Sequence, residues 1–170
     1  LEAQFATFKV MGVPINVNYR YKSAELIYLL DNSDAEAVFF QSCYADQVEE
    51  IVEELPNIKT WIQVGNDSIK DLSFAFKYND ILNQHQQMER IIRSEDNTYM
   101  IYTGGTTGMP KGVMYTHGGF ATSMFGTLKQ QGYEVPDVRN RDNLLKLEPI
   151  LKKMDKNNLL NSCLIACPLM

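Results

Sequence analysis

Residues 102–112 combine glycine, threonine and lysine in a pattern suited to an anion; they read Tyr-Thr-Gly-Gly-Thr-Thr-Gly-Met-Pro-Lys-Gly. Glycine lets backbone N–H groups approach a ligand without interference from a Cβ atom. Consecutive N–H groups in such a turn form a concave nest that suits an anion. Threonine hydroxyls can donate to phosphate oxygens or ligate a hard metal ion, and lysine adds a compact positive charge. These residue types at this spacing predict a loop that binds a polyphosphate.

This loop differs from the two best-known glycine-rich phosphate binders. A P-loop reads G-x-x-x-x-G-K followed by Ser or Thr, but position 109 is methionine and Lys111 is followed by Gly112. The dinucleotide pattern G-x-G-x-x-G also fails, because no middle glycine stands between Gly105 and Gly108. The alternative is a plain glycine-rich turn joining two strands. It would account for the glycines but not for the threonines and the lysine beside them.

The loop resembles the signature of the adenylate-forming superfamily, which comprises acyl-CoA synthetases, luciferases and the adenylation domains of peptide synthetases. The usual pattern is close to Tyr or Phe, then T-S-G, then Ser or Thr, then T-G-x-P-K-G. This sequence departs from it at Gly104, where serine is common. Glycine there removes one hydroxyl donor but leaves the other glycines and threonines to hold a phosphate. Residues 5–19 are also similar to the acyl-CoA synthetase segment that precedes the loop.

The resemblance implies a two-step reaction. A carboxylate, expected to be that of a fatty acid, attacks the α-phosphorus of ATP and gives an acyl-adenylate and pyrophosphate. The thiol of coenzyme A then displaces AMP. The first step brings two anions together, so positioning and electrostatic stabilisation should provide most of the catalysis. Mg2+ would bridge phosphate oxygens and draw charge from the leaving pyrophosphate.

Within this scheme the resemblance implies roles for individual loop residues. Lys111 would offset charge on the departing pyrophosphate, and Thr107 would help to hold the metal, so these two are the candidate catalytic residues. Thr103 would close the rim of the loop, and Pro110 should stiffen the backbone before the lysine. The residues expected to bind the nucleotide are Thr103, Gly104, Gly105, Thr106, Thr107, Gly108 and Lys111.

Other polar residues have simpler interpretations. His117 could touch substrate or pyrophosphate, but its place at the expected start of a helix favours a structural residue at a strand-to-helix turn. Asp96 is interpreted as an acidic turn residue before a strand. Tyr99 and Tyr102 fit strand packing better than stacking on a base. Four glutamates within 46–55 are expected on the solvated side of a helix.

The composition is that of one globular unit. The chain has 170 residues, 45% of them hydrophobic and 22% charged, with a formal net charge of −5. The acidic balance, without a basic stripe among aromatic residues, argues against a nucleic-acid partner. No apolar run is long enough to span a bilayer. Cys43, Cys163 and Cys167 do not form a disulfide framework, so we expect reduced thiols, the last two in a buried strand, and a cytoplasmic protein.

Alternating strand and helix patterns predict an α/β fold with a layered, largely parallel sheet flanked by helices. Pro149 should kink or split the last helix, Ser23 is the expected N-cap of the second, and Gly12 the expected stop of the first. The strand at 37–40 is expected to be buried on both faces. Helices are expected at 1–11, 24–30, 46–55, 81–92, 120–131 and 144–154. Strands are expected at 13–18, 37–40, 58–64, 99–102, 113–115 and 162–167.

The chain has the features of an internal piece of a longer enzyme. It begins within a predicted helix, without an initiator methionine, and stops directly after a predicted strand. We expect residues 1–170 to be part of an N-terminal AMP-binding domain with its phosphate loop at 102–112, the C-terminal lid domain lying outside this chain. Such a piece should have no ligase turnover alone. Two alternatives stay open: an amino-acid adenylation domain serving a carrier protein, and a non-catalytic nucleotide-binding homologue.

Overall fold

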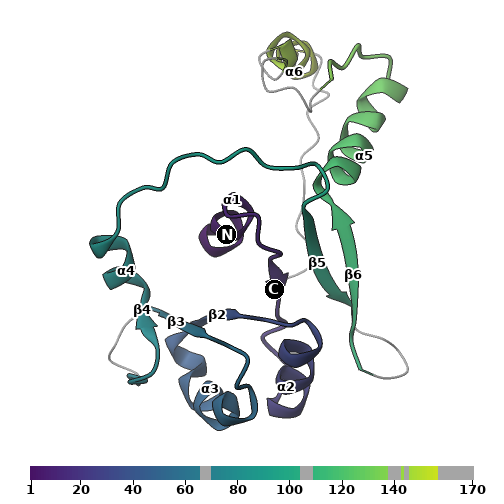
Figure 1. Ribbon diagram of the computed structural model, residues 1–170. Coiled ribbons are helices and arrows are strands. Elements are labelled where there is room, and N and C mark those ends of the chain that lie inside the picture. Colours follow the sequence, from purple (N-terminus) through teal and green to yellow (C-terminus); the bar gives the residue numbers. More distant parts are fainter. Residues whose placement is uncertain (66–69, 104–108, 138–142, 144–145, 157–170) are drawn as a thin grey trace.

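The computed structural model describes residues 1–65, 70–103, 109–137, 143 and 146–156. In this part of the chain the strands form two three-stranded sheets, and each sheet contains parallel neighbours. Figure 1 shows one sheet with its helices at the bottom, and the other sheet ending in a long hairpin at the right. The predicted α/β class is confirmed, with the strands divided between two sheets instead of extending one.

The lower unit in Figure 1 contains most of the hydrophobic core. Its sheet is fully parallel, and α2 and α3 lie together beneath it. Leu29 and Ile51 are almost completely buried, and burying such a side chain contributes about 1.5–3 kcal/mol. The elements are α2 (Ser23–Asn32), β2 (Ala37–Gln41), α3 (Ala45–Ile51), β3 (Thr60–Val64) and β4 (Phe76–Lys77).

The second sheet has the strand order β1-β5-β6. β1 (Ile15–Asn16) is parallel to β5 (Thr98–Thr103), and β5 is antiparallel to β6 (Lys111–Thr116). All of the lower unit is therefore inserted between β1 and β5. Strand β6 forms an edge of this sheet among the described residues, and every one of its residues is exposed.

The remaining helices lie outside these sheets. The segment 85–97 runs from α4 to β5, as the arc above α1 in Figure 1 shows. Within the described residues, none of the helices combines the length and the hydrophobicity that crossing a bilayer requires. The helices are α1 (Glu2–Lys9), α4 (Tyr78–Gln84), α5 (His117–Gln130) and α6 (Glu148–Lys156), with 3-10 turns η1 (Ser42–Tyr44) and η2 (Val52–Glu54).

Two helix ends differ from the predictions for local reasons. Met11, not Gly12, takes the left-handed backbone conformation after α1, with φ of 62°. Lys22, not Ser23, precedes α2, and its backbone N–H donates to the Glu25 carboxylate at 3.0 Å. That contact satisfies one of the N–H groups that a helix start leaves unpaired.

Three further predictions are corrected. The helix expected at 81–92 is found earlier, as α4, and the two-residue strand β4 before it is too short to leave a pattern. In β2 only Phe40 is buried, because the described helices of this unit cover one face of its sheet. Pro149 is the second residue of α6, where a missing N–H breaks no helical bond, so the helix is not split.

The strand expected at 162–167, with Cys163 and Cys167, lies outside the described residues.

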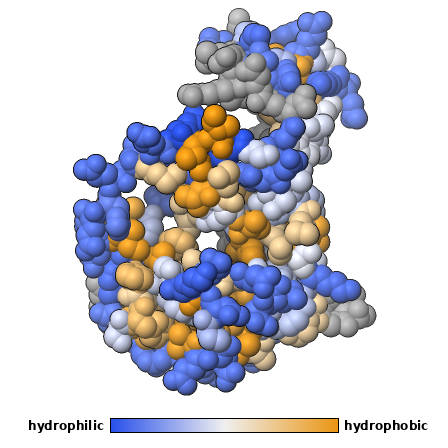
Figure 2. Space-filling view, in the orientation of Figure 1, coloured by the Kyte–Doolittle hydropathy of each residue, from blue (hydrophilic) through white to orange (hydrophobic). Residues whose placement is uncertain are grey.

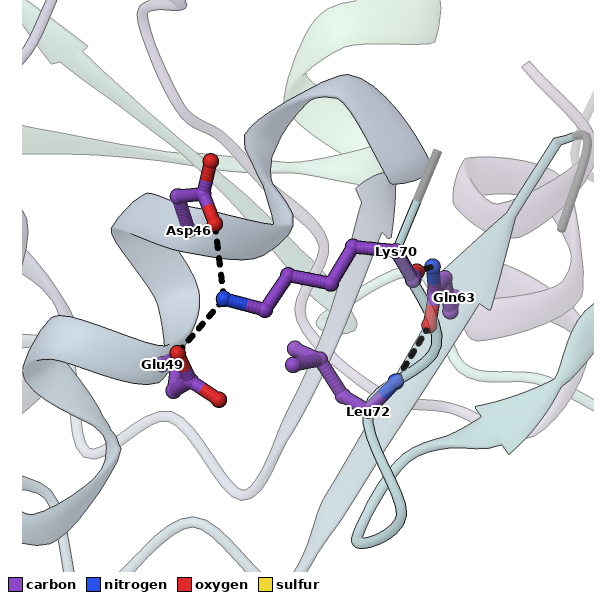
Figure 3. A network of polar contacts seen from close by, with 5 residues as sticks. All are labelled: Asp46, Glu49, Gln63, Lys70 and Leu72. Atoms are coloured by element: carbon purple, nitrogen blue, oxygen red, sulfur yellow. Dashed lines mark hydrogen bonds and ion pairs between the residues drawn. The ribbon is translucent and has the colours of Figure 1, made fainter. Parts of the chain in front are cut away.

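A buried amide at the end of β3 ties the following segment to the sheet (Figure 3). The Gln63 side chain is buried; it donates to the Lys70 carbonyl and accepts from the Leu72 N–H at 3.4 Å. The Lys70 ammonium contacts the α3 carboxylates of Asp46 at 2.7 Å and Glu49 at 2.6 Å, and these bonds raise the pKa of Lys70. Residues 70–72 are thus held against both β3 and α3. The predicted solvated acidic side of this helix is confirmed.

The surface of the described residues carries many large apolar side chains. Ile92 is 96% exposed, and Met114 and Phe5 are 67% and 60% exposed. In Figure 2 apolar atoms lie around a hollow near the middle of the face shown and in a patch above it. Contiguous exposed apolar surface is typical of places that contact other protein, a membrane or a ligand.

Candidate functional site

The predicted phosphate loop is the connection of the β5–β6 hairpin. The strands are paired in antiparallel register up to Thr103 and Lys111, which face each other as the last pair before the loop. The Thr103 hydroxyl donates to the Lys111 carbonyl at 3.4 Å, which closes the end of the ladder. The hairpin therefore brings two of the predicted site residues together, one at each side of the loop entrance.

Both residues at the loop entrance are accessible to a ligand. Thr103 and Lys111 are exposed, and the Lys111 ammonium forms no ion pair with any described residue. Pro110, directly before Lys111, is buried, so the backbone that enters β6 is packed against the protein. An ammonium without an ion pair to any described residue, on a supported backbone, suits the oxygens of a phosphate chain.

The loop itself lies outside the described residues. Its members are Gly104, Gly105, Thr106, Thr107 and Gly108, and their roles stay predictions. The same holds for Thr107 as a metal ligand. Across the described ranges, no three His, Cys, Asp or Glu side chains gather into a group that could hold a metal ion. The described side chains at the loop entrance thus fit the phosphates better than the metal.

The loop end of the hairpin is held by a buried tyrosine. Tyr102 is 6% exposed, belongs to the hydrophobic core, and donates its hydroxyl proton to Asn32 Oδ1 at 2.8 Å. Burial raises the pKa of Tyr102, helped by nearby Tyr28 and Asp34, which keeps the hydroxyl protonated as a donor. The ring lies against Gly112, its partner in the register. Packing of Tyr102 was predicted, but nothing in the sequence indicated Asn32.

The helix after β6 does not supply an anion site. In a P-loop the helix N-terminus follows the loop directly, whereas here all of β6 separates them, roughly 17 Å of strand. The first N–H groups of α5 are also already used. Those of His117 and Gly118 donate to the carbonyls of Asn97 and Glu95 at 2.8 Å, and that of Gly119 donates to the Thr116 hydroxyl at 3.0 Å. This helix would therefore give no help to an anion bound at the loop.

His117 lies at that opposite end of the hairpin, far from Lys111. It is the first residue of α5, so the structure places it at a strand-to-helix turn as predicted. Its ring packs edge-on against Phe8, with 4.7 Å between ring centroids, and Nε2 is buried with no hydrogen-bond partner among the described residues. Burial lowers the pKa of His117, and Arg93 lowers it further. This environment stabilises the neutral imidazole and fits a structural residue.

The His117 environment predicts a loss of stability in mild acid. The pKa of His117 in the folded state lies below the ordinary histidine value of about 6.5, so the unfolded chain takes up a proton first as the pH falls. The stability that His117 contributes is complete above about pH 6.5 and declines as the pH falls toward the folded-state pKa. Thermal unfolding followed between pH 8 and pH 5 should show a drop in melting temperature that is smaller in His117→Gln.

The control for this prediction is the second histidine of the chain. His85 is exposed at the end of α4, so His85→Gln should leave the pH dependence of the melting temperature unchanged. Equal pH profiles for the wild type and His117→Gln would contradict the assignment.

Comparison with known proteins gives the following similarities. The family model described as "AMP-binding enzyme" matches residues 1–163. The medium-chain acyl-CoA ligase Mig of Mycobacterium avium is 40% identical over 129 residues, which are 74% of this chain and 24% of that protein. The 3-oxocholest-4-en-26-oate–CoA ligase of Rhodococcus rhodochrous is 41% identical over 120 residues, 69% of this chain and 22% of that protein. The chain thus spans about a quarter of the length of these relatives.

A solved structure supports the fold. The acetoacetyl-CoA synthetase of Streptomyces lividans superposes with a TM-score of 0.64 at 18% identity, over 74% of this chain and 21% of that one. At that identity the likeness concerns the architecture alone. The described strands and helices therefore match part of the fold of a larger enzyme.

Proposed function

Because the chain belongs to the family of AMP-binding enzymes, we propose that it is part of an ATP-dependent acid–thiol ligase. The observation that carries this proposal is the hairpin whose last pair, Thr103 and Lys111, frames the predicted phosphate loop inside the region that the family model matches. The proposed reaction joins a carboxylic acid to AMP and then transfers the acyl group to coenzyme A.

In the proposed first step the hairpin end binds and orients the triphosphate. A carboxylate oxygen forms a bond to the α-phosphorus while the bond to the leaving pyrophosphate breaks. The Lys111 ammonium, which no described carboxylate neutralises, offsets the charge that develops on the pyrophosphate. The Thr103 hydroxyl, turned away from its long bond to the Lys111 carbonyl, and the loop N–H groups hold the remaining phosphate oxygens. Magnesium, when bound, adds further withdrawal of charge from these oxygens.

The proposed acyl substrate is an acid with a large apolar body, in the first instance a fatty acid. The names of the similar proteins support this choice, since one is a medium-chain acyl-CoA ligase and another acts on a steroid acid. They also favour coenzyme A over a carrier protein as acceptor. An amino-acid adenylation domain is therefore the less supported alternative. The alternative of a non-catalytic homologue is supported only by the glycine at position 104.

We further propose that residues 1–170 form part of the N-terminal domain of this ligase. Ile92, Met114 and Phe5 expose large apolar side chains, and in the complete domain we expect other segments to cover them. The apolar surface in Figure 2 is in keeping with this arrangement. In this proposal the lid domain and the metal-binding carboxylate come from elsewhere in the full-length protein.

The proposed function is tested with the full-length protein that contains this chain. Pyrophosphate release is measured with ATP and a panel of fatty acids, a steroid acid and amino acids, each with and without coenzyme A, and acyl-CoA is identified by mass spectrometry. We expect release that depends on an apolar carboxylic acid and an acyl-CoA product. Release only with amino acids would support the adenylation-domain alternative, and no release with any acid would support the non-catalytic one.

A separate prediction concerns the 170-residue chain alone. It should release no measurable pyrophosphate with any acid of the same panel, because the lid domain and the metal-binding carboxylate are proposed to come from elsewhere in the full-length protein. Acid-dependent pyrophosphate release by the purified chain would contradict the proposed division into domains.

A further inference from the structure

We propose that the contact between Tyr102 and Asn32 positions the phosphate loop, which makes both of them positioning residues for the nucleotide step. This inference rests on the proposed function of the loop and extends it to two residues outside the motif's phosphate contacts. The argument starts from the way in which the end of β5 is held.

The loop end of β5 extends beyond its parallel neighbour. The register of β1 pairs Ile15 with Met100 and Asn16 with Ile101, and it stops there. Tyr102 and Thr103 therefore have β6 on one side but no paired strand residue on the other among the described residues. Although Pro110 before β6 is buried, β6 itself is exposed throughout, so the end of β5 needs a contact of its own to keep a fixed direction.

Tyr102 supplies that contact. It is the residue of the β5–β6 hairpin that belongs to the buried core cluster, and it directly precedes exposed Thr103 at the loop entrance. Its ring is held between Gly112 on the neighbouring strand and the core, while its hydroxyl reaches Asn32 at 2.8 Å. One side chain thus connects the last hydrogen-bonded pairs of the hairpin to a different layer of the protein.

Asn32 lies on a rigid support. It is the last residue of α2, and α2 is fixed by Leu29 and Leu30, which are 0% and 6% exposed. The turn after it is closed by hydrogen bonds from Ser33 N–H to the Leu29 carbonyl at 3.0 Å and from Ala35 N–H to the Leu30 carbonyl at 3.1 Å. The tyrosine hydroxyl is therefore attached to a part of the fold that does not depend on the hairpin.

The contact is suited to positioning more than to global stability. Asn32 is exposed, so water can solvate its amide when the tyrosine hydroxyl is removed, and the protein stays folded. What is lost is the fixed direction of the hairpin end. Reacting groups must be held within fractions of an ångström for efficient reaction, so a looser hairpin end should weaken the handling of ATP in particular.

The test uses the full-length protein and four single variants in the pyrophosphate-release assay. Tyr102→Phe and Asn32→Ala remove the contact, whereas Asn32→Asp retains an acceptor oxygen for the tyrosine. Tyr99→Phe is the matched control, because this tyrosine lies on the same strand and its hydroxyl bonds no described residue. We expect the KM for ATP to rise by about three- to tenfold in Tyr102→Phe and Asn32→Ala. It should stay near the wild-type value in Asn32→Asp and Tyr99→Phe.

Three further readouts separate positioning from a purely structural role. The KM for the carboxylic acid and the melting temperature should change little. The double variant Tyr102→Phe/Asn32→Ala should have a KM for ATP no higher than that of the more impaired single variant. An unchanged KM for ATP in Tyr102→Phe would overturn the inference. A parallel rise in both KM values with a lower melting temperature would overturn it as well, because that is the result of general loosening.

The inference and the proposed function fail in different ways. Lys111→Ala, measured beside these variants, reports on the loop itself. If Lys111→Ala raises the KM for ATP while Tyr102→Phe does not, only the positioning role is overturned. If neither variant changes any ATP-dependent parameter, the loop assignment is overturned and the positioning role with it.

Discussion

Replacing Lys111 with alanine is expected to lower kcat/KM for ATP in pyrophosphate release by roughly one to two decades, since a charge-assisted hydrogen bond contributes about 1.5–3 kcal/mol. The structure gives this lysine an exposed ammonium at the loop entrance, with no ion pair to any described residue. Its charge is therefore available to the phosphates of the proposed substrate. The loss should fall mainly on the adenylation step, measured as single-turnover formation of the acyl-adenylate.

The matched control is Lys129→Ala. Lys129 is an exposed lysine in the last turn of α5, so this variant removes the same charge away from the loop. It should retain wild-type kcat/KM for ATP. Equal activity of Lys111→Ala and Lys129→Ala would contradict the role assigned to Lys111.

Replacing Gly112 with alanine is expected to lower the free energy of unfolding by about 1–3 kcal/mol, the usual effect of an added methyl group in a packed site. A Cβ atom there would lie 2.8 Å from Met100 Sδ and 3.2 Å from two ring atoms of Tyr102. The methionine can move aside, since its side chain is flexible. The tyrosine ring cannot do so without giving up its bond to Asn32. Denaturant unfolding of wild type and variant measures the difference.

A second glycine provides a control with the opposite sign. Gly126 lies inside α5, and a Cβ atom there would meet nothing within 4 Å. Gly126→Ala should therefore raise the free energy of unfolding by up to about 1 kcal/mol, because alanine favours helix over glycine. A neutral or stabilising effect of Gly112→Ala would disprove the close packing of Gly112 against Tyr102 at the loop end of the hairpin.

The position of the loop differs from that in a P-loop, where a helix N-terminus follows the loop directly. Here the loop joins two antiparallel strands, and the next helix along the chain starts at the other end of β6 with its first N–H groups already bonded within the chain. Under the proposed function the phosphates would then be bound by loop N–H groups, hydroxyls and Lys111 and not by a helix N-terminus. This would account in physical terms for the threonines and the lysine of the motif.

The sequence alone was sufficient for the features that depend on neighbouring residues. The loop motif identified the family because its chemistry is contained in one contiguous segment, and the family match confirms that identification. The spacing of apolar residues predicted most helices and strands, because that spacing follows the backbone geometry of the helix or strand itself. The strands around the loop were found as β5 and β6, and the helix after them as α5, beginning at His117.

Only the tertiary structure decided which distant residues meet. Asn32 and Tyr102 are 70 positions apart, and an exposed asparagine at a helix end carries no local sign of such a partner. In the sequence Gly112 is only a member of the motif. Its packing against the Tyr102 ring follows from the pairing of β5 with β6. The division of the strands into two sheets also depends on long-range pairing. Local patterns specify elements, whereas contacts between elements depend on how the whole chain packs.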